Sequence, residues 1–412
     1  MARSLIMNIT EPITLPCGLT LENRIAKAAM TENLADLNNN PNEKILELYR
    51  RFAAGGSGLL ITGNVMIDRS ALAEPRNIVV EDESSLDLLA EWAKKVQNYG
   101  TKIFMQLNHP GRQSPAFLSK RPVAPSDVGL DTWNNLAFNR PRALTHDEIE
   151  NLIASFARSA LIAQKAGFDG VQIYGSHGYL ISQFLSPLSN LRTDVWGGSL
   201  ENRMRFLVRV YEAIRESVGS AFPVALKINS ADFERGGFSN EESLFVIEKL
   251  ASLGLDLIEI SGGTFEKAAM TGVNLRASTR RREAYFIEFS QWVKSKVSIP
   301  VMLTGGFRTG AAINSALREN IIDIVGLARP LAQNPDFALE LIMNSNAESK
   351  ISPIRTGIEC IDNIGFLEIG WYELQMARIA DGKSPDPDLN AWQAIAELFL
   401  KNGIDAFLKK RA

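Results

Sequence analysis

The chain has 412 residues, of which 45% are hydrophobic and 22% are charged, as is ordinary for a soluble globular enzyme. A net charge of −3 lacks the basic excess typical of nucleic-acid binding, and two cysteines with three histidines leave no disulfide framework, iron–sulfur cluster or zinc site to expect. No apolar run reaches the roughly 18 residues of a membrane span. We therefore expect no metal, no nucleic-acid partner and no membrane partner.

The N-terminal segment predicts a short hairpin. The start, MARSLIMNITEPITLP, has one basic residue and no long apolar core, so it does not resemble a secretory signal and indicates a cytoplasmic protein. The overlapping stretch ITEPITLPCGLTLENRI, residues 9–25, has the composition of a hairpin. We expect this hairpin to close the floor of the fold.

Eight short apolar runs follow, and they predict strands buried on both faces of a parallel sheet. In chain order they cover residues 24–30, 58–63, 102–107, 167–173, 223–228, 254–260, 300–305 and 320–327. Amphipathic helices lie between them, and two of these begin with capping boxes, Thr145 with Glu148 and Ser239 with Glu242. Because such crossovers are right-handed, the chain is predicted to form an α/β fold, a (β/α)8 TIM barrel. An open doubly wound sheet is the alternative.

Two insertions and a tail complete this organisation. Residues 111–146 follow the third strand and residues 262–290 the sixth, so both are expected on the catalytic face as substrate loops. Arg280, Arg281 and Arg282 are interpreted as part of such a loop rather than as a nucleic-acid patch. Residues 345–412 predict a helical extension. With no linker in view, residues 1–412 are predicted to be a single domain.

Three polar rings gather at the end of the fourth predicted strand. In VQIYGSHGYL, residues 171–180, Val171 and Ile173 continue the strand, and the glycines that follow end it. Tyr174, His177 and Tyr179 therefore fall at its carboxyl end, where barrel enzymes carry their chemistry. A buried, hydrogen-bonded core tyrosine is the structural alternative.

The segment HGYLISQFLSPLSNLRTDVWGGSLENRMRF, residues 177–206, is similar to the signature of the old yellow enzyme family of flavin-dependent ene reductases. Further similar segments, in order, are NRIAKAAMT (23–31), GLLITGNV (58–65), QLNHPGRQ (106–113), ISGGT (260–264), LTGGF (303–307) and GLARP (326–330). This resemblance implies a (β/α)8 barrel with non-covalent FMN at the carboxyl ends of its strands. It also implies reduction by NADH or NADPH and reoxidation by an activated alkene.

The resemblance assigns the flavin phosphate to the ends of strands seven and eight. Gly305 and Gly306 follow the seventh strand, and Ala328 with Arg329 follows the eighth, where barrels commonly bind phosphate. Small residues allow backbone N–H groups to approach, and Arg329 offers a charged fork. Glycines that serve only as a turn are the alternative for the first pair.

The isoalloxazine ring is expected against the ends of the first, second, third and fifth strands. The Gln106 amide can both donate to and accept from the pyrimidine edge, and Lys227 places a positive charge beside N1 and C2=O. Many family members have arginine at that position, and lysine keeps the charge but loses the fork. A Schiff base on Lys227 is the mechanistic alternative. Thr31 matches the donor to flavin C4=O. Ala29, Met30, Gly63 and Asn64 match positions that line the ring.

The three rings then acquire substrate roles. Tyr174 and His177 match two side chains that bind the substrate's electron-withdrawing oxygen, and Tyr179 matches the tyrosine that protonates the alkene. Tyr174 departs from the family because histidine is usual there, which affects substrate preference more than reaction type. Of the other histidines, His109 either borders the flavin or is structural, and His146 is expected at the surface.

The sequence thus predicts an FMN-dependent oxidoreductase that passes hydride from NAD(P)H to the β-carbon of a small activated alkene. One alternative is a flavin-carrying binding or sensor protein in which Tyr174 marks an impaired substrate grip. Another is a flavin-free barrel lyase that uses Lys227. The sequence leaves the natural alkene, the nicotinamide preference and homo-oligomerisation open.

Overall fold

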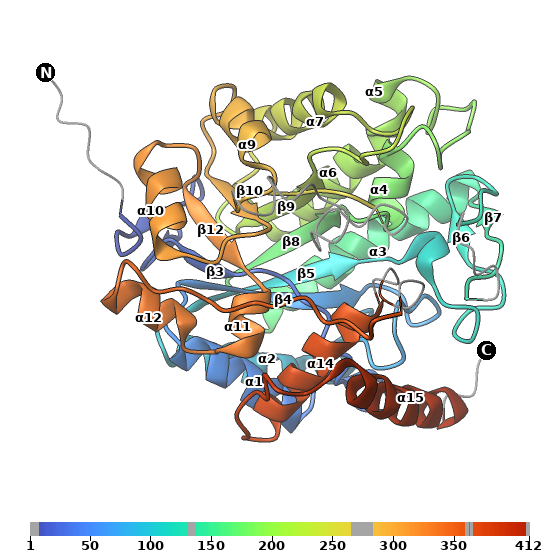
Figure 1. Ribbon diagram of the computed structural model, residues 1–412. Coiled ribbons are helices and arrows are strands. Elements are labelled where there is room, and N and C mark those ends of the chain that lie inside the picture. The colour runs from blue at the N-terminus through green and yellow to red at the C-terminus, as the bar shows by residue number, and fades with distance from the viewer. Residues whose placement is uncertain (1–7, 131–136, 265–282, 359–361, 363–365, 409–412) are drawn as a thin grey trace, which may run out of the picture.

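The computed structural model describes residues 8–130, 137–264, 283–358, 362 and 366–408. Its centre is a closed barrel of parallel strands in which each strand pairs with the next one along the chain and the last pairs with the first (Figure 1). The strands are β3 (Ile25–Lys27), β4 (Leu59–Met66), β5 (Lys102–Asn108), β8 (Gly170–Gly175), β9 (Val224–Asn229), β10 (Leu257–Ser261), β11 (Val301–Thr304) and β12 (Ile324–Leu327).

Each of the eight predicted runs overlaps one barrel strand, so the TIM-barrel prediction is confirmed. The alternative of an open doubly wound sheet is wrong, because β12 pairs with β3 through Val325 and Ile25 and leaves no free edge. Closure lets every strand bury both faces, which is why the runs are apolar throughout.

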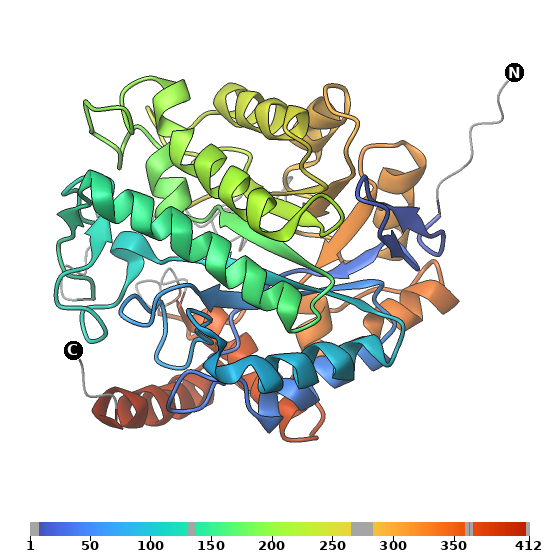
Figure 2. The same cartoon turned by 180° about the vertical axis from the view of Figure 1, so that it is seen from behind.

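Helices surround the barrel. They are α1 (Glu43–Ala54), α2 (Leu86–Gln97), α3 (His146–Lys165), α4 (Leu180–Leu185), α5 (Leu200–Arg203), α6 (Arg205–Val218), α7 (Asn240–Ser252), α9 (Ile287–Lys294), α10 (Gly310–Arg318), α11 (Arg329–Gln333), α12 (Phe337–Met343), α14 (Phe366–Ala380) and α15 (Ala391–Leu408). Figure 2 shows α3 and α6 side by side across one flank, where they pack closely. None of the helices in the described part of the chain is both long and apolar enough to cross a membrane.

Both predicted capping boxes are confirmed. Thr145 accepts from the Glu148 amide and Glu148 bonds back to the Thr145 amide, which fixes the start of α3. Ser239 and Glu242 make the same reciprocal pair at the start of α7. Each box pairs two backbone donors that a helix start leaves free, so sequence alone locates these boundaries.

The hydrophobic core has two parts. The larger part lies between the strands and the surrounding helices, and the smaller fills the lower barrel with side chains such as Phe104, Leu257 and Met302. Leu15 and Leu21 belong to the smaller part. They come from the two-stranded hairpin of β1 (Ile13–Thr14) and β2 (Thr20–Leu21), which therefore closes the floor as predicted.

Two other additions lie on the barrel. A small pair of strands, β6 (Val123–Ala124) and β7 (Arg142–Ala143), organises the described part of the 111–146 insertion. The tail predicted to be helical over residues 345–412 contains α14 and α15, and α14 packs against α1, α11 and α15 (Figure 1). Most of the 262–290 insertion, including Arg280, Arg281 and Arg282, lies outside the described residues.

Candidate active site

Above the apolar floor, the barrel interior becomes polar. Alternate residues of a strand point the same way, so the residues two positions after Phe104 and Leu257 also face inward; these are Gln106 and Glu259. Gln106 Nε2 donates to Gln172 Oε1 at 2.7 Å, and Gln172 Nε2 donates to Glu259 Oε2 at 2.7 Å. A continuous hydrogen-bonded layer therefore spans β5, β8 and β10.

Lys227 joins this layer as the partner of Glu259. The two residues are neighbours in the β9–β10 register, their Nζ and Oε1 atoms lie 2.9 Å apart, and both side chains are buried. Thr304 Oγ1 donates to the same carboxylate oxygen at 2.7 Å. An ammonium ion held by a carboxylate has no free lone pair, which disfavours Lys227 as a Schiff-base nucleophile.

Unpaired polar atoms point to a ligand at this level of the barrel. Within the described residues, Gln106 Oε1 and both Asn108 amide atoms are buried without a hydrogen-bond partner. Leaving such atoms unpaired costs about 1–3 kcal/mol each, so a bound group with matching donors and acceptors is expected. The pyrimidine edge of a flavin has an N–H donor and carbonyl acceptors, and it fits this donor set.

Beyond this polar layer, towards the carboxyl ends of the strands, the three predicted rings lie together. Tyr174 and Tyr179 have ring centroids 4.8 Å apart, and the Tyr174 hydroxyl lies 2.8 Å from His177 Nδ1. The other imidazole nitrogen, Nε2, lies 2.8 Å from the Ser261 Oγ. The structure thus brings Tyr174, His177 and Tyr179 into one half-buried cluster.

His177 has an unusual backbone conformation, which a hydrogen bond to Asn229 helps to hold. Its φ of 59° lies in the left-handed region, which non-glycine residues rarely adopt. Its amide donates to Asn229 Oδ1 at 3.1 Å. Burial, and then the nearby Lys227 charge, lower the imidazole pKa well below its usual range, so the ring is neutral.

Both tyrosines are protonated. Burial raises the pKa of Tyr174, and Tyr179, Glu259 and Glu74 raise it further. Burial also raises the pKa of Tyr179, with Glu74 and Glu373 adding to the effect and a hydrogen bond to Asn64 opposing it. Both phenols therefore hold a proton at neutral pH.

The predicted phosphate end is occupied by protein groups. Gly305 and Gly306 have φ values of 131° and 91°, and a Cβ on Gly306 would lie 2.6 Å from the ring of Tyr285. Only glycine fits this turn beneath the aromatic side chain. Arg329 Nη1 lies 2.7 Å from Glu368 Oε1 of α14. Arg329 is the first residue of α11, and Ala328 joins it to the end of β12.

The predicted ring-lining residues in β4 and in the segment after β3 also have protein partners. Thr31 Oγ1 hydrogen-bonds the Glu74 carboxylate. The Gly63 amide donates to Tyr49 Oη at 2.9 Å and to Glu32 Oε1 at 3.1 Å, and a Cβ there would lie 2.0 Å from Glu32. The backbone carbonyl oxygen of Met30 would lie 2.5 Å from the same Cβ, so the close approach of backbone and carboxylate requires Gly63. Ala29 and Met30 are half-buried beside this turn.

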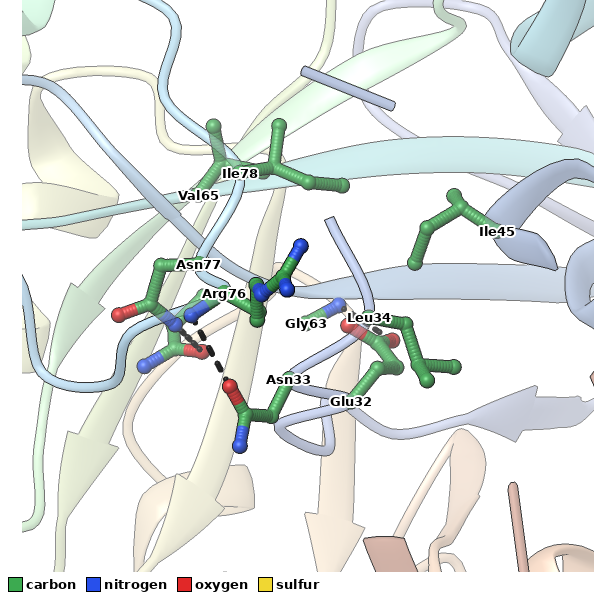
Figure 3. A pocket seen from close by; sticks show the side chains of 10 residues that line it. Glu32, Asn33, Leu34, Ile45, Gly63, Val65, Arg76, Asn77 and Ile78 are labelled. Atoms are coloured by element: carbon green, nitrogen blue, oxygen red, sulfur yellow. Dashed lines mark hydrogen bonds between the residues drawn. The ribbon is translucent and has the colours of Figure 1, made fainter. Parts of the chain in front are cut away.

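Figure 3 shows a small pocket beside these residues, where Glu32 and Asn33 face Gly63 and Asn77. Asn33 Oδ1 accepts from the backbone amide of Arg76 at 3.0 Å. The Asn33 amide also donates to Glu373 of α14 at 3.4 Å. Helix α14 therefore contacts this end of the site in addition to the end at Arg329.

The remaining histidines have structural contacts. His109 is buried, its Nδ1 accepts from the Gly111 amide at 3.1 Å, and burial lowers its pKa to about 4. His146 is exposed, as predicted, and its Nδ1 accepts from the Trp196 indole at 2.9 Å.

Sequence reasoning missed several site residues. They are Glu32, Glu74, Gln172, Asn229, Glu259, Ser261, Glu368 and Glu373. A signal existed for Gln172, Asn229, Glu259 and Ser261, because each is a polar residue on the inward face of a strand whose outward-facing residues are apolar or glycine. No comparable signal marks Glu368 or Glu373, which reach the site only because α14 packs against the barrel.

A closed parallel barrel with an amide, an ammonium group and three rings at the carboxyl ends of its strands fits the class predicted from the sequence, a flavin-binding oxidoreductase with a TIM barrel. Residues 8–348 match the model of the NADH:flavin oxidoreductase / NADH oxidase family. The chain belongs to this family, which confirms the predicted resemblance to old yellow enzymes. Membership makes the chain an NAD(P)H-dependent flavin oxidoreductase and implies FMN as its cofactor.

Individual relatives agree. The NADH-dependent flavin oxidoreductase iliE of Hypocrea jecorina (strain QM6a) is 41% identical over 361 residues, which cover 81% of this chain and 88% of that protein. The NADPH dehydrogenase of Clostridium acetobutylicum is 34% identical and covers 81% and 94% of the two chains. The solved structure of the old yellow enzyme homologue from Zymomonas mobilis has a TM-score of 0.70 at 26% identity, and covers 84% and 95%.

Proposed function

We propose that this protein reduces the carbon–carbon double bond of small α,β-unsaturated carbonyl compounds. The observation that carries the proposal is the cluster of Tyr174, His177 and Tyr179 directly above the polar layer of Gln106 and Lys227. When bound, FMN supplies hydride transfer from NADH or NADPH to the acceptor. The protein's own groups bind the two reactants, orient them and deliver a proton.

The residues that would hold FMN are those whose chemistry matches its parts. The unpaired Gln106 Oε1 suits the pyrimidine N–H, and Lys227 supplies positive charge at the base of the ring. Thr31 is proposed as the hydroxyl at C4=O. Arg329 and the turn of Gly305 and Gly306 are proposed for the phosphate, which then shares Arg329 with Glu368 or displaces that carboxylate.

Ala29, Met30, Gly63, Asn64 and Ala328 are proposed to line the cofactor. Among them, Asn64 also bears on the chemistry, because it partly offsets the rise that burial causes in the pKa of Tyr179, the phenol that we assign as proton donor. Tyr179 keeps its proton at neutral pH, as an acid must.

Tyr174 and His177 are proposed to bind the carbonyl oxygen of the acceptor. A hydrogen bond to this oxygen polarises the alkene and stabilises the charge that develops on the oxygen. Because the Tyr174 and Tyr179 rings are 4.8 Å apart, oxygen binding and protonation address one small substrate.

The experiment is an anaerobic titration of the purified protein. A yellow spectrum with one FMN per chain, bleached by NADH or NADPH and restored by cyclohex-2-enone, is the expected result. Bleaching without recovery by several enones would instead favour the binding or sensor alternative. A colourless protein that takes up no added FMN would contradict the proposal altogether. Parallel titrations with NADH and NADPH also give the nicotinamide preference.

A further inference from the structure

Tyr174 and His177 belong to a hydrogen-bonded chain of three side chains, and Ser261 is the third. Ser261 Oγ, the two nitrogens of His177 and the Tyr174 hydroxyl are joined by contacts of 2.8 Å and 2.8 Å. Ser261 ends β10, is almost fully buried, and has Asn229 as its neighbour in the β9–β10 register. Asn229 in turn fixes the His177 backbone.

A neutral imidazole carries one proton, so this chain has two arrangements. In the first, Tyr174 donates to Nδ1, and Nε2–H donates to Ser261; the only tyrosine proton is then used inside the protein. In the second, Ser261 donates to Nε2, and Nδ1–H donates to the Tyr174 oxygen. Only the second arrangement leaves the Tyr174 O–H free to donate to a substrate.

Resting on the proposed function, we infer that Ser261 is a positioning residue that sets the His177 tautomer, so that Tyr174 alone donates to the carbonyl oxygen of the substrate. This narrows the proposed pair of Tyr174 and His177 to one direct donor, because His177 then acts through Tyr174 rather than by contact with that oxygen. The ligands that this arrangement selects are acceptors of a single hydrogen bond, such as an enone oxygen or a phenolate.

The arrangement also accounts for tyrosine at position 174. A phenol whose oxygen accepts a hydrogen bond becomes a better donor through its own O–H, because hydrogen bonds in a chain polarise one another. Burial, together with the charge of Lys227, which lies 5.9 Å from the Tyr174 ring centre, lowers the pKa of His177 and keeps it neutral, so the chain depends on one tautomer.

The tautomer can be read directly by ¹⁵N NMR, because the protein has three histidines. His109 and His146 each accept a hydrogen bond at Nδ1, so their neutral rings carry the proton on Nε2 and serve as internal references. With phenol bound to the FMN-loaded protein, we expect His177 alone to be protonated on Nδ1. Protonation of His177 on Nε2 in that complex overturns the inference.

Variants give a second test. Ser261→Ala removes the donor to Nε2, and a neutral hydrogen bond lost in this way should weaken phenol binding and raise the KM for cyclohex-2-enone by roughly 2- to 12-fold. The rate of flavin reduction at saturating NAD(P)H should change less than either of these two quantities. Ser261→Thr keeps the hydroxyl and should retain binding better than Ser261→Ala.

A double-mutant cycle separates this role from a loss of packing. In a Tyr174→Phe background the hydroxyl that connects the His177 tautomer to the ligand is gone. Ser261→Ala should therefore have little further effect on phenol affinity. Equal effects of Ser261→Ala in both backgrounds overturn the inference. If neither the wild type nor any variant reduces enones, the proposed function fails. If the wild type reduces them and Ser261→Ala equals wild type in KM and phenol affinity, only this inference fails.

Discussion

Arg329 and Glu368 form an ion pair 2.7 Å long, which links the end of β12 to the C-terminal helix α14. The guanidinium that we assign to the flavin phosphate thus already has an anionic partner. That partner comes from beyond residue 348, where the family match ends. FMN and the Glu368 carboxylate are therefore expected to compete for one cation.

Arg329→Ala should weaken FMN binding about 10- to 150-fold, because a charge-assisted hydrogen bond is worth roughly 1.5–3 kcal/mol. Riboflavin, which lacks the phosphate, should bind the variant and the wild type alike. Fluorescence titration of the apoprotein with the two flavins measures both affinities. Unchanged FMN affinity in a folded Arg329→Ala protein would remove Arg329 from the phosphate site.

Glu368→Gln should act in the opposite direction. The amide keeps the shape of the side chain but not its charge, so the phosphate meets no repulsion and FMN should bind more tightly. Riboflavin affinity again serves as the control. Weaker FMN binding in Glu368→Gln would mean that the carboxylate orients Arg329 for the phosphate instead of competing with it.

The buried pair of Lys227 and Glu259 makes a prediction about redox potential. Glu259→Gln leaves the Lys227 charge uncompensated next to the cofactor and should raise the flavin midpoint potential, whereas Lys227→Met should lower it. Each single change breaks a buried ion pair and should cost about 3–5 kcal/mol of stability. The double variant Lys227→Met/Glu259→Gln should recover part of that stability. Spectroelectrochemical titration and chemical unfolding give the two readouts, and a potential that is unaltered in both single variants would place Lys227 away from the ring.

Much of the barrel was predictable because its strands obey a simple physical rule. A strand buried on both faces is apolar, so apolar runs such as 102–107 and 223–228 predict the barrel strands. The capping boxes at Thr145 and Ser239 predict where two of the helices begin. Glu259 lies inside such a run, residues 254–260, and could have been recognised as a buried carboxylate from the sequence. A carboxylate at an inward-facing position needs a buried partner, and Lys227 on the next strand is that partner.

The contributions of the C-terminal tail could not be predicted in the same way. The sequence predicts a helical tail over residues 345–412, but the position at which its helix α14 docks depends on tertiary packing against α1 and α11. Glu368 and Glu373 therefore reach Arg329 and Asn33 without any local signal. The Tyr174–His177 contact was equally hidden, because the resemblance assigns both side chains to the substrate rather than to each other.

The carboxyl groups at the ring end predict how stability depends on pH. Burial raises the pKa of Glu373 to about 7 and raises that of Glu74 as well, so the folded protein holds a proton that the unfolded chain releases near 4.5. Stability from this proton is fully present below pH 4.5 and is lost as the pH rises towards 7, by about 1 kcal/mol per pH unit. Lys401 offsets part of the effect on Glu373, and Glu32 adds to it.

Glu373→Gln should remove the part of that dependence that Glu373 contributes and leave the part that comes from Glu74. The amide stays neutral at every pH, so the free energy of unfolding of the variant relative to wild type should increase between pH 4.5 and 7. Urea unfolding at several pH values measures the difference. Glu81→Gln, at a partly exposed ion pair with Arg69, is the matched control and should follow the wild type. Parallel curves for Glu373→Gln and wild type would contradict the prediction.

Tyr179 should be the proton donor of the alkene-reducing half-reaction. Hydride addition to the β-carbon leaves enolate character on the substrate, and a phenol that stays protonated can give its proton to the α-carbon. General acid catalysis contributes about 10²- to 10⁴-fold, so Tyr179→Phe should slow reoxidation by cyclohex-2-enone by that factor. Its FMN content and its reduction by NAD(P)H should stay close to wild type.

Stopped-flow measurement of the two half-reactions tests this assignment of Tyr179. Tyr211→Phe is the matched control, because the Tyr211 hydroxyl donates to the Leu253 carbonyl, away from the barrel mouth; this variant should leave both rates unchanged. Equal slowing of both half-reactions in Tyr179→Phe would indicate general damage to the pocket. A wild-type rate of enone reduction would mean that solvent or another group supplies the proton, since the phenylalanine variant retains the ring and loses only the hydroxyl.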